Sequence, residues 1–203
     1  MIFGVGYLGY KKRDLVQQMQ VKYLPFFNNG KEKTQAYIVW EKMLARCYNK
    51  ATQKYSPTYI NCSVCESWHN FQNFAEWFYQ NYKENYQLDK DILLKNNKIY
   101  SPETCCFIPQ EINLLLGKNK AKRGLYPIGV TLDKRRNKFQ ARYKFNGKCI
   151  HCGEFDTPEL AFAEYKKQKE LHIKEIAEKY YKQNLIEENV YQALIKYQIE
   201  ITD

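Results

Sequence analysis

Three short stretches in the middle of the chain decide how this region folds: LDKDIL at residues 88–93, IYSPETCCF at residues 99–107 and QEIN at residues 110–113. The first two place branched or aromatic side chains beside turn-forming residues, a composition typical of short strands. The third opens a run of helix-forming residues. We therefore expect a strand, a loop, a second strand and then a helix, which is a ββα unit.

This segment resembles the ββα finger of HNH homing endonucleases from phages and introns, in which D-H-I is followed by P-E-N-L-R-W. The resemblance continues upstream in YIVWEKMLARCYN at residues 37–49 and CSVCESWHNFQNF at residues 62–74. Aligned on these motifs, Asp91 takes the place of the catalytic histidine, Thr104 that of the central asparagine and Asn113 that of the last metal ligand. The resemblance implies a homing-type nuclease that nicks or cleaves DNA with Mg²⁺ or Mn²⁺.

The residues at these positions would have to supply the chemistry of phosphodiester cleavage. Such a site needs a base that activates water and a divalent ion that stabilises the charge developing on the phosphate. Asp91 and Asn113 offer the oxygen ligands that Mg²⁺ prefers, with Asp89 or Glu103 as further acids. His69 is the one histidine of this region and is therefore the candidate base. The alternative for His69 is a capping or surface role at a helix start.

Two segments upstream of the finger carry apolar side chains at helical spacing. One runs from residue 34 to residue 46 and the other from residue 71 towards residue 82, and both repeat every three or four positions, as one face of a helix does. We expect two amphipathic helices that pack aromatic faces into a small core. Their inward residues are Tyr37, Trp40, Met43, Leu44, Phe71, Phe74, Ala75 and Phe78.

The seven cysteines favour reduced thiols over a disulfide framework, because their number is odd and they lie within patterned segments. Cys62, Cys65 and Cys105, with Cys47 as a fourth ligand, could hold a structural Zn²⁺. The alternative is that they are small buried apolar side chains. A second spaced pair is missing, and adjacent cysteines on a strand point to opposite faces.

No targeting or membrane-spanning segment is evident in the sequence. Residues 1–10 are apolar but lack the leading basic residues and the longer apolar core of a signal peptide. Nowhere do about 18 apolar residues run together, as a transmembrane helix requires. With the reduced cysteines, these features predict a cytoplasmic protein without a membrane partner, and the resemblance to phage proteins implies a bacterial host cell.

A second unit follows a charged stretch at residues 118–124, whose composition is typical of a flexible linker. Residues 138–145 alternate between polar and apolar side chains, as expected of a strand with one buried face. Asn146-Gly147 is a strong hairpin signal, so we expect three antiparallel strands within residues 128–155. Thr157 followed by Pro158 predicts the start of a helix. Its inward face is expected to hold Ala161, Phe162, Tyr165 and Leu171.

This second unit resembles the Apetala-two domain, a three-stranded sheet packed on one helix that is known from plant transcription factors and is also attached to phage HNH nucleases. The resemblance rests on GVTLDKRRNKFQARYK at residues 129–144 and CGEFDTPELAFAEY at residues 152–165, with Cys152 in the place of the usual leucine. In that family the exposed face of the sheet enters the major groove of DNA. By position and by strand alternation, the DNA-binding residues expected here are Thr131, Arg135, Arg136, Lys138, Gln140, Arg142, Lys144 and His151.

The charge of the chain fits a polyanionic partner. Lysines and arginines number 32 and acids 22, which gives +10 at neutral pH, and residues 118–148 hold eleven basic residues against one acid. Cations that bind nucleic acid release the counterions of its phosphates. Three functions remain open: a metal-dependent nuclease or nickase, an inactive relative that binds duplex DNA or regulates, and a phage protein that inhibits a host nuclease, a defence protein or a ribonucleoprotein complex.

The expected organisation is an α+β protein with two small domains. At 203 residues the chain is long enough for one large hydrophobic core or two small ones, and the change in residue pattern along it favours two. A strand and turn segment occupies residues 1–33 and the HNH-like domain residues 34–117. After the linker, the Apetala-two-like domain spans residues 125–180 and a helical tail residues 181–203.

Overall fold

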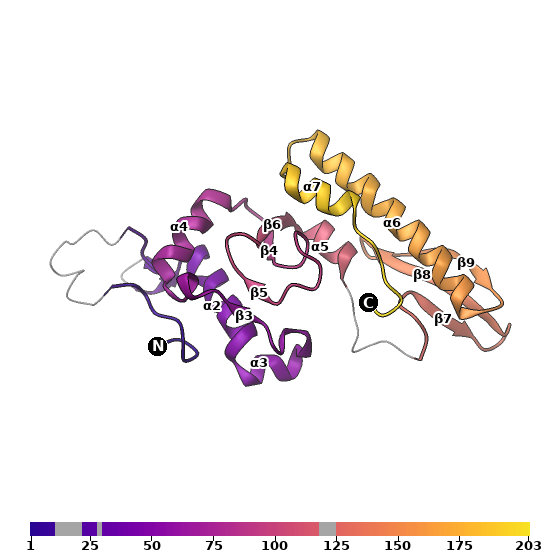
Figure 1. The fold of residues 1–203 in the computed structure, drawn as a ribbon, viewed down its shortest axis with the longest axis horizontal. Helices are drawn as coiled ribbons and strands as arrows, with labels where there is room; N and C mark the ends of the chain where they lie inside the picture. The colour runs from indigo at the N-terminus through magenta and orange to yellow at the C-terminus, as the bar shows by residue number, and fades with distance from the viewer. Residues whose placement is uncertain (11–21, 28–29, 118–124) are drawn as a thin grey trace. The chain divides into compact units, whose positions relative to one another are not determined.

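The computed structural model describes residues 1–10, 22–27, 30–117 and 125–203 (Figure 1). The chain divides into two compact units, Met1–Phe107 and Ile108–Asp203, and helices and small sheets occur in both. It is therefore a mixed α and β protein with small sheets, as the sequence predicts. The predicted linker at residues 118–124 lies outside the described residues. Among the described helices, none is long and apolar enough to cross a membrane.

The first unit is built from helices and very short strands. Its elements in chain order are β1 (Phe26–Phe27), β2 (Glu32–Lys33), α2 (Gln35–Tyr48), α3 (Lys50–Tyr55), η1 (Pro57–Tyr59), β3 (Ser63–Val64), η2 (Glu66–His69), α4 (Phe71–Asn81), β4 (Tyr86–Asp89) and β5 (Ile99–Tyr100). β1 pairs antiparallel with β2, and β3 pairs in parallel with β5. Because ladders of two residues contribute few hydrogen bonds, this unit depends on the packing of its helices.

Side-chain caps fix where the two main helices begin. The Thr34 hydroxyl accepts a hydrogen bond from the backbone N–H of Tyr37 at 3.3 Å and caps α2. The Asn70 side chain accepts from the N–H of Gln72 at 3.0 Å and caps α4. The inward residues predicted for both helices are buried, which confirms the two amphipathic faces.

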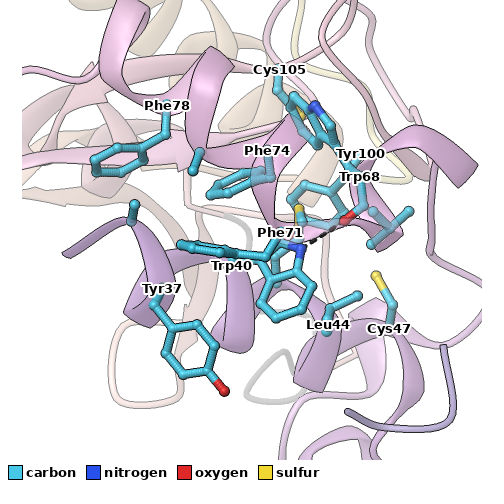
Figure 2. Packing of buried hydrophobic residues seen from close by; sticks show 14 of the residues in the cluster. Tyr37, Trp40, Leu44, Cys47, Trp68, Phe71, Phe74, Phe78, Tyr100 and Cys105 are labelled. Atoms are coloured by element: carbon cyan, nitrogen blue, oxygen red, sulfur yellow. Dashed lines mark hydrogen bonds between the residues drawn. The ribbon is translucent and has the colours of Figure 1, made fainter. Parts of the chain in front are cut away.

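The buried faces of α2 and α4 meet in an aromatic core (Figure 2). Trp40 has no exposed surface, and its indole N–H donates to the backbone carbonyl of Trp68 at 2.7 Å. The centroid of its ring lies 5.4 Å from that of Phe71 and 5.7 Å from that of Tyr37. Aromatic pairs at such distances contribute about 0.5–1.5 kcal/mol beyond their burial, so these rings are a main source of stability in the first unit.

The segment predicted as a ββα unit forms strands followed by a helix, with two corrections. β4 pairs with β6 (Cys106–Pro109), and α5 (Gln110–Leu116) follows directly. Residues 99–107, expected as one strand, hold β5 and the start of β6, separated by a turn in which the Cys105 N–H donates to the Ser101 carbonyl at 3.0 Å. The first strand ends at Asp89 rather than continuing to Leu93, which places Asp91 in a loop.

A three-stranded sheet dominates the second unit. Its strands are β7 (Val130–Asp133), β8 (Lys138–Phe145) and β9 (Lys148–Phe155), antiparallel and in the order β7-β8-β9. Asn146 and Gly147 join β8 to β9 with φ angles of 48° and 74°, the positive values that a two-residue hairpin turn requires. The predicted three-stranded antiparallel sheet is thus confirmed.

Helix α6 (Pro158–Lys182) packs on the sheet, and α7 (Glu188–Ile195) packs on α6 (Figure 1). The Thr157 hydroxyl caps α6 by accepting from the N–H of Leu160 at 3.3 Å, as predicted. Two expectations for the inward face were wrong: Leu171 is 52% exposed, and Phe162 is only half-buried. The buried stripe follows four-residue steps that leave position 171 on the opposite side: Ala161, Tyr165, Lys169, Ile173, Ile176 and Ala177.

Candidate nucleic-acid interface

Asp91, the predicted metal ligand and centre of the finger, is paired with a neighbouring lysine. Its Oδ1 lies 2.5 Å from Nζ of Lys90, whose side chain is only 5% exposed, whereas that of Asp91 is 52% exposed. The same ammonium donates to the backbone carbonyl of Asn97 at 2.8 Å. The carboxylate that would bind Mg²⁺ therefore already neutralises a buried cation.

The other polar groups of this loop act on its backbone. Asp89 accepts from the N–H of Asp91 at 2.7 Å and of Ile92 at 2.8 Å, and burial raises the pKa of its carboxyl. The Thr104 hydroxyl, at the place of the central asparagine, donates to the carbonyl of Ile99 at 2.9 Å. A hydrogen bond from Ser101 lowers the pKa of the exposed Glu103. These hydrogen bonds hold the backbone of the loop in place, so the side chains that form them have a structural role.

The buried ammonium of Lys90 predicts a measurable contribution to folding. In Lys90→Met the carbonyl of Asn97 loses its partner inside the protein, and we expect unfolding to become easier by about 1–3 kcal/mol. The ion pair with Asp91 adds less to the free energy of unfolding, because the Asp91 side chain is half-exposed and solvent screens its charge. The three tryptophans all lie in the first unit, so urea unfolding followed by their fluorescence reports on it.

The exposed Lys54 provides the control for this measurement. Lys54→Met removes the same charge from the surface and should change the free energy of unfolding by no more than about 0.5 kcal/mol. Equal stability of the two variants would contradict the structural role of Lys90.

The remaining residues predicted for catalysis occupy separate elements. His69 lies in η2, where its Nε2 is 3.4 Å from the hydroxyl of Tyr48. Asn113 lies on α5 and belongs to the second unit, whereas His69 and Asp91 belong to the first. His69 thus contacts Tyr48, which packs against the aromatic core, and the cap of α4 is Asn70 rather than His69.

The cysteines proposed as zinc ligands lie mostly in the core of the first unit. Cys47, Cys62 and Cys105 are buried, and Cys65 is half-buried. Burial raises the pKa of Cys47 and of Cys105 to about 12, which favours the neutral thiol. Within residues 1–10, 22–27, 30–117 and 125–203, no three His, Cys, Asp or Glu side chains are grouped so that they could hold a metal ion. Cys47, Cys62 and Cys105 are part of the buried apolar cluster of the first unit.

The outer face of the sheet, opposite α6, is the second candidate site. Alternation along β8 puts Lys138, Gln140, Arg142 and Lys144 on this face, as predicted. Cross-strand pairing adds neighbours from β7 and β9: Thr131 and Glu154 beside Gln140, Asp133 beside Lys138, His151 beside Arg142, and Cys149 beside Lys144. The face therefore carries a second acid, Glu154, that the count over residues 118–148 did not include.

These acids engage the cations at one end of the face, which we call the paired half (Arg136, Lys138, Gln140, Asp133, Glu154 and Asp156). Arg136 Nη1 donates to both carboxylate oxygens of Glu154, at 2.9 and 3.1 Å. Lys138 forms an ion pair with Asp156. Gln140 Nε2 donates to Glu154 at 3.1 Å and to Asp133 at 3.3 Å. Three of the residues predicted to bind DNA thus have partners within the protein.

The other end of the face, which we call the open half, consists of Arg142, Lys144 and His151. All three side chains are exposed. Within the part of the chain that the structure describes, neither the Arg142 nor the Lys144 side chain has a hydrogen-bond or ion-pair partner. Lys148 lies opposite Phe145 at the start of β9 and so belongs to the face that carries α6. The open half thus presents two cations, Arg142 and Lys144, to an anionic partner.

Two other predicted DNA-binding residues, Arg135 and Thr131, belong to neither half. Arg135 is exposed in the turn between β7 and β8, where its backbone N–H donates to Asp133 at 3.0 Å. The Thr131 hydroxyl is buried, without a hydrogen-bond partner among the described residues. Thr131 therefore does not present its hydroxyl on the surface of this face.

In the open half, the side chains of Arg142 and Lys144 have no partner within the described part of the chain. Exposed guanidinium and ammonium groups on a sheet suit phosphate and the base edges of nucleic acid. The loop around Asp91, by contrast, has its charges paired and its backbone braced. Comparison of the chain with protein-family models, with curated proteins and with solved structures finds no match.

Proposed function

We propose that this protein binds duplex DNA through the outer face of β7, β8 and β9, with the open half supplying the contacts to phosphate. The observation that carries the proposal is the exposed pair Arg142 and Lys144, whose side chains lack partners among the described residues, whereas Arg136 and Lys138 on the same face have them. The major groove of B-DNA admits strands of a sheet. The net charge of +10 supports a polyanionic partner.

The proposal is for binding rather than cleavage. A metal ion at Asp91 would share the carboxylate with Lys90, whose ammonium lies 2.5 Å from Oδ1 and also donates to the Asn97 carbonyl. Two cations beside one carboxylate repel each other, which weakens the binding of the metal. The pairing of Lys90 with Asp91 therefore supports a finger segment that stabilises the fold.

Supercoiled plasmid distinguishes binding from cleavage. Incubated with the protein and either Mg²⁺ or Mn²⁺, it should remain supercoiled at protein concentrations that retard it on a gel. Nicking that disappears in Asp91→Ala would instead establish the finger as a nuclease site.

Salt dependence tests the binding itself. Phosphate contacts make log K fall linearly with log salt, with a slope of about 0.9 for each phosphate neutralised. We expect a random-sequence duplex to bind with a clear negative slope, and Arg142→Ala combined with Lys144→Ala to reduce the size of that slope by about 2. Binding that is absent at low salt, or that shows no dependence on salt, would overturn the proposal.

A further inference from the structure

We propose that the paired half of the sheet reads bases, and that Glu154 and Asp133 do this by fixing Gln140 as a hydrogen-bond acceptor towards the major groove. The inference rests on the proposed binding of duplex DNA and adds which residue sets specificity and which base group it selects.

The orientation of the Gln140 amide follows from its two neighbours. Its nitrogen lies 3.1 Å from a carboxylate oxygen of Glu154 and 3.3 Å from one of Asp133. Ionised carboxylates only accept hydrogen bonds, so both must face the NH₂ group of the amide. Both N–H groups are then used within the protein, and the carbonyl oxygen remains for an outside partner.

Glu154 is itself held in place. It accepts from Arg136 Nη1 at 2.9 and 3.1 Å as well as from Gln140. These two partners lower the pKa of its carboxyl, so it stays ionised at neutral pH and keeps accepting from the amide. The arrangement is thus present before DNA arrives, which reduces the entropy lost on binding.

A Gln side chain that is free usually reads adenine with both its N–H and its oxygen. With the N–H groups occupied, Gln140 can only accept, so it favours the amino group of cytosine or adenine and disfavours the oxygens of guanine and thymine. The carboxylates beside it repel phosphate, which keeps the DNA backbone on the open half. The open half therefore contributes affinity for phosphate, and the paired half contributes selectivity between bases.

The test is a selection of binding sites from a pool of random-sequence duplexes, carried out on the intact chain. Wild type should enrich a motif with cytosine or adenine at one fixed position, and replacement of that base by thymine or guanine should weaken binding about tenfold. Gln140→Ala should lose this preference and keep the salt slope of wild type. Glu154→Gln removes the ion pair of Arg136 and leaves Asp133 as the one carboxylate beside the amide, so it should bind random duplex more tightly and reduce the tenfold preference at least threefold.

The outcomes separate this inference from the proposed function. If wild type enriches no motif, or if Gln140→Ala and Glu154→Gln keep the preference of wild type, the inference is overturned and duplex binding stands. If wild type does not retain duplex DNA even at low salt, the proposed function fails and this inference fails with it. Circular dichroism of both variants, which change exposed or half-buried side chains, checks that they are folded.

Discussion

Replacement of Trp40 by alanine should destabilise the first unit by about 3–5 kcal/mol. The side chain has no exposed surface, lies against Tyr37 and Phe71, and donates to the carbonyl of Trp68 at 2.7 Å. Removing it leaves a large cavity and a buried carbonyl without its donor. A domain of this size is stable by only about 5–15 kcal/mol, so the loss takes a large part of the total.

Urea unfolding followed by the fluorescence of the remaining tryptophans, Trp68 and Trp77, measures this effect. Trp40→Phe is the control, because it keeps an aromatic ring in the core and removes only the N–H and part of the volume. We expect it to lie between wild type and Trp40→Ala. A loss below about 1 kcal/mol in Trp40→Ala would show that the aromatic core is not organised around this residue.

Replacement of Gly129 by alanine should strongly destabilise the sheet that we propose to bind DNA. Gly129 has a φ angle of 79°, and an added Cβ would lie 2.1 Å from the ring of the buried Tyr165. Its carbonyl also accepts from the N–H of Arg142 at 2.8 Å. Backbone strain and overpacking each cost about 1–3 kcal/mol, so we expect a loss of about 2–6 kcal/mol and weaker DNA binding.

Gly147 is the matched control for Gly129. Its φ angle is 74°, and an added Cβ would meet nothing within 4 Å. Gly147→Ala therefore carries the strain of a positive φ without the clash, and about 1–2 kcal/mol of destabilisation is expected. Hydrogen exchange of the β8 amides compares the two variants, and similar exchange in both would contradict the role assigned to the contact between Gly129 and Tyr165.

Local patterns predicted much of the fold because each is decided by neighbours in sequence. The aromatic spacing of α2 and α4, the Asn146-Gly147 turn and the start of α6 at Thr157 all follow this rule. Leu171 was assigned to the wrong face because the inward stripe of α6 contains Lys169, whose Nζ lies 3.0 Å from the hydroxyl of Tyr165. A lysine in a buried stripe breaks the apolar pattern on which the prediction relied.

The paired half could not be predicted because it depends on an irregularity in the sheet. From the hairpin turn, regular pairing would set Gln140 opposite Gly153 and turn Glu154 towards α6. A register shift after Arg142 and His151 instead pairs Ala141 with Gly153 and Gln140 with Glu154. One extra residue in β9 therefore brings Glu154 to the outer face. The pairing of Asp91 with Lys90 was missed for a similar reason, because the strand that would have separated their side chains ends at Asp89.

The most direct measurement compares two double variants that lose the same charge. Arg142→Ala with Lys144→Ala removes two cations from the open half, and Lys167→Ala with Lys174→Ala removes two exposed cations from α6, which packs on the other face of the sheet. Titration of a random-sequence duplex at one moderate salt concentration should show about tenfold or greater weakening for the first variant and little change for the second. Equal weakening in both would show that binding follows net charge alone and would contradict the assignment of the site.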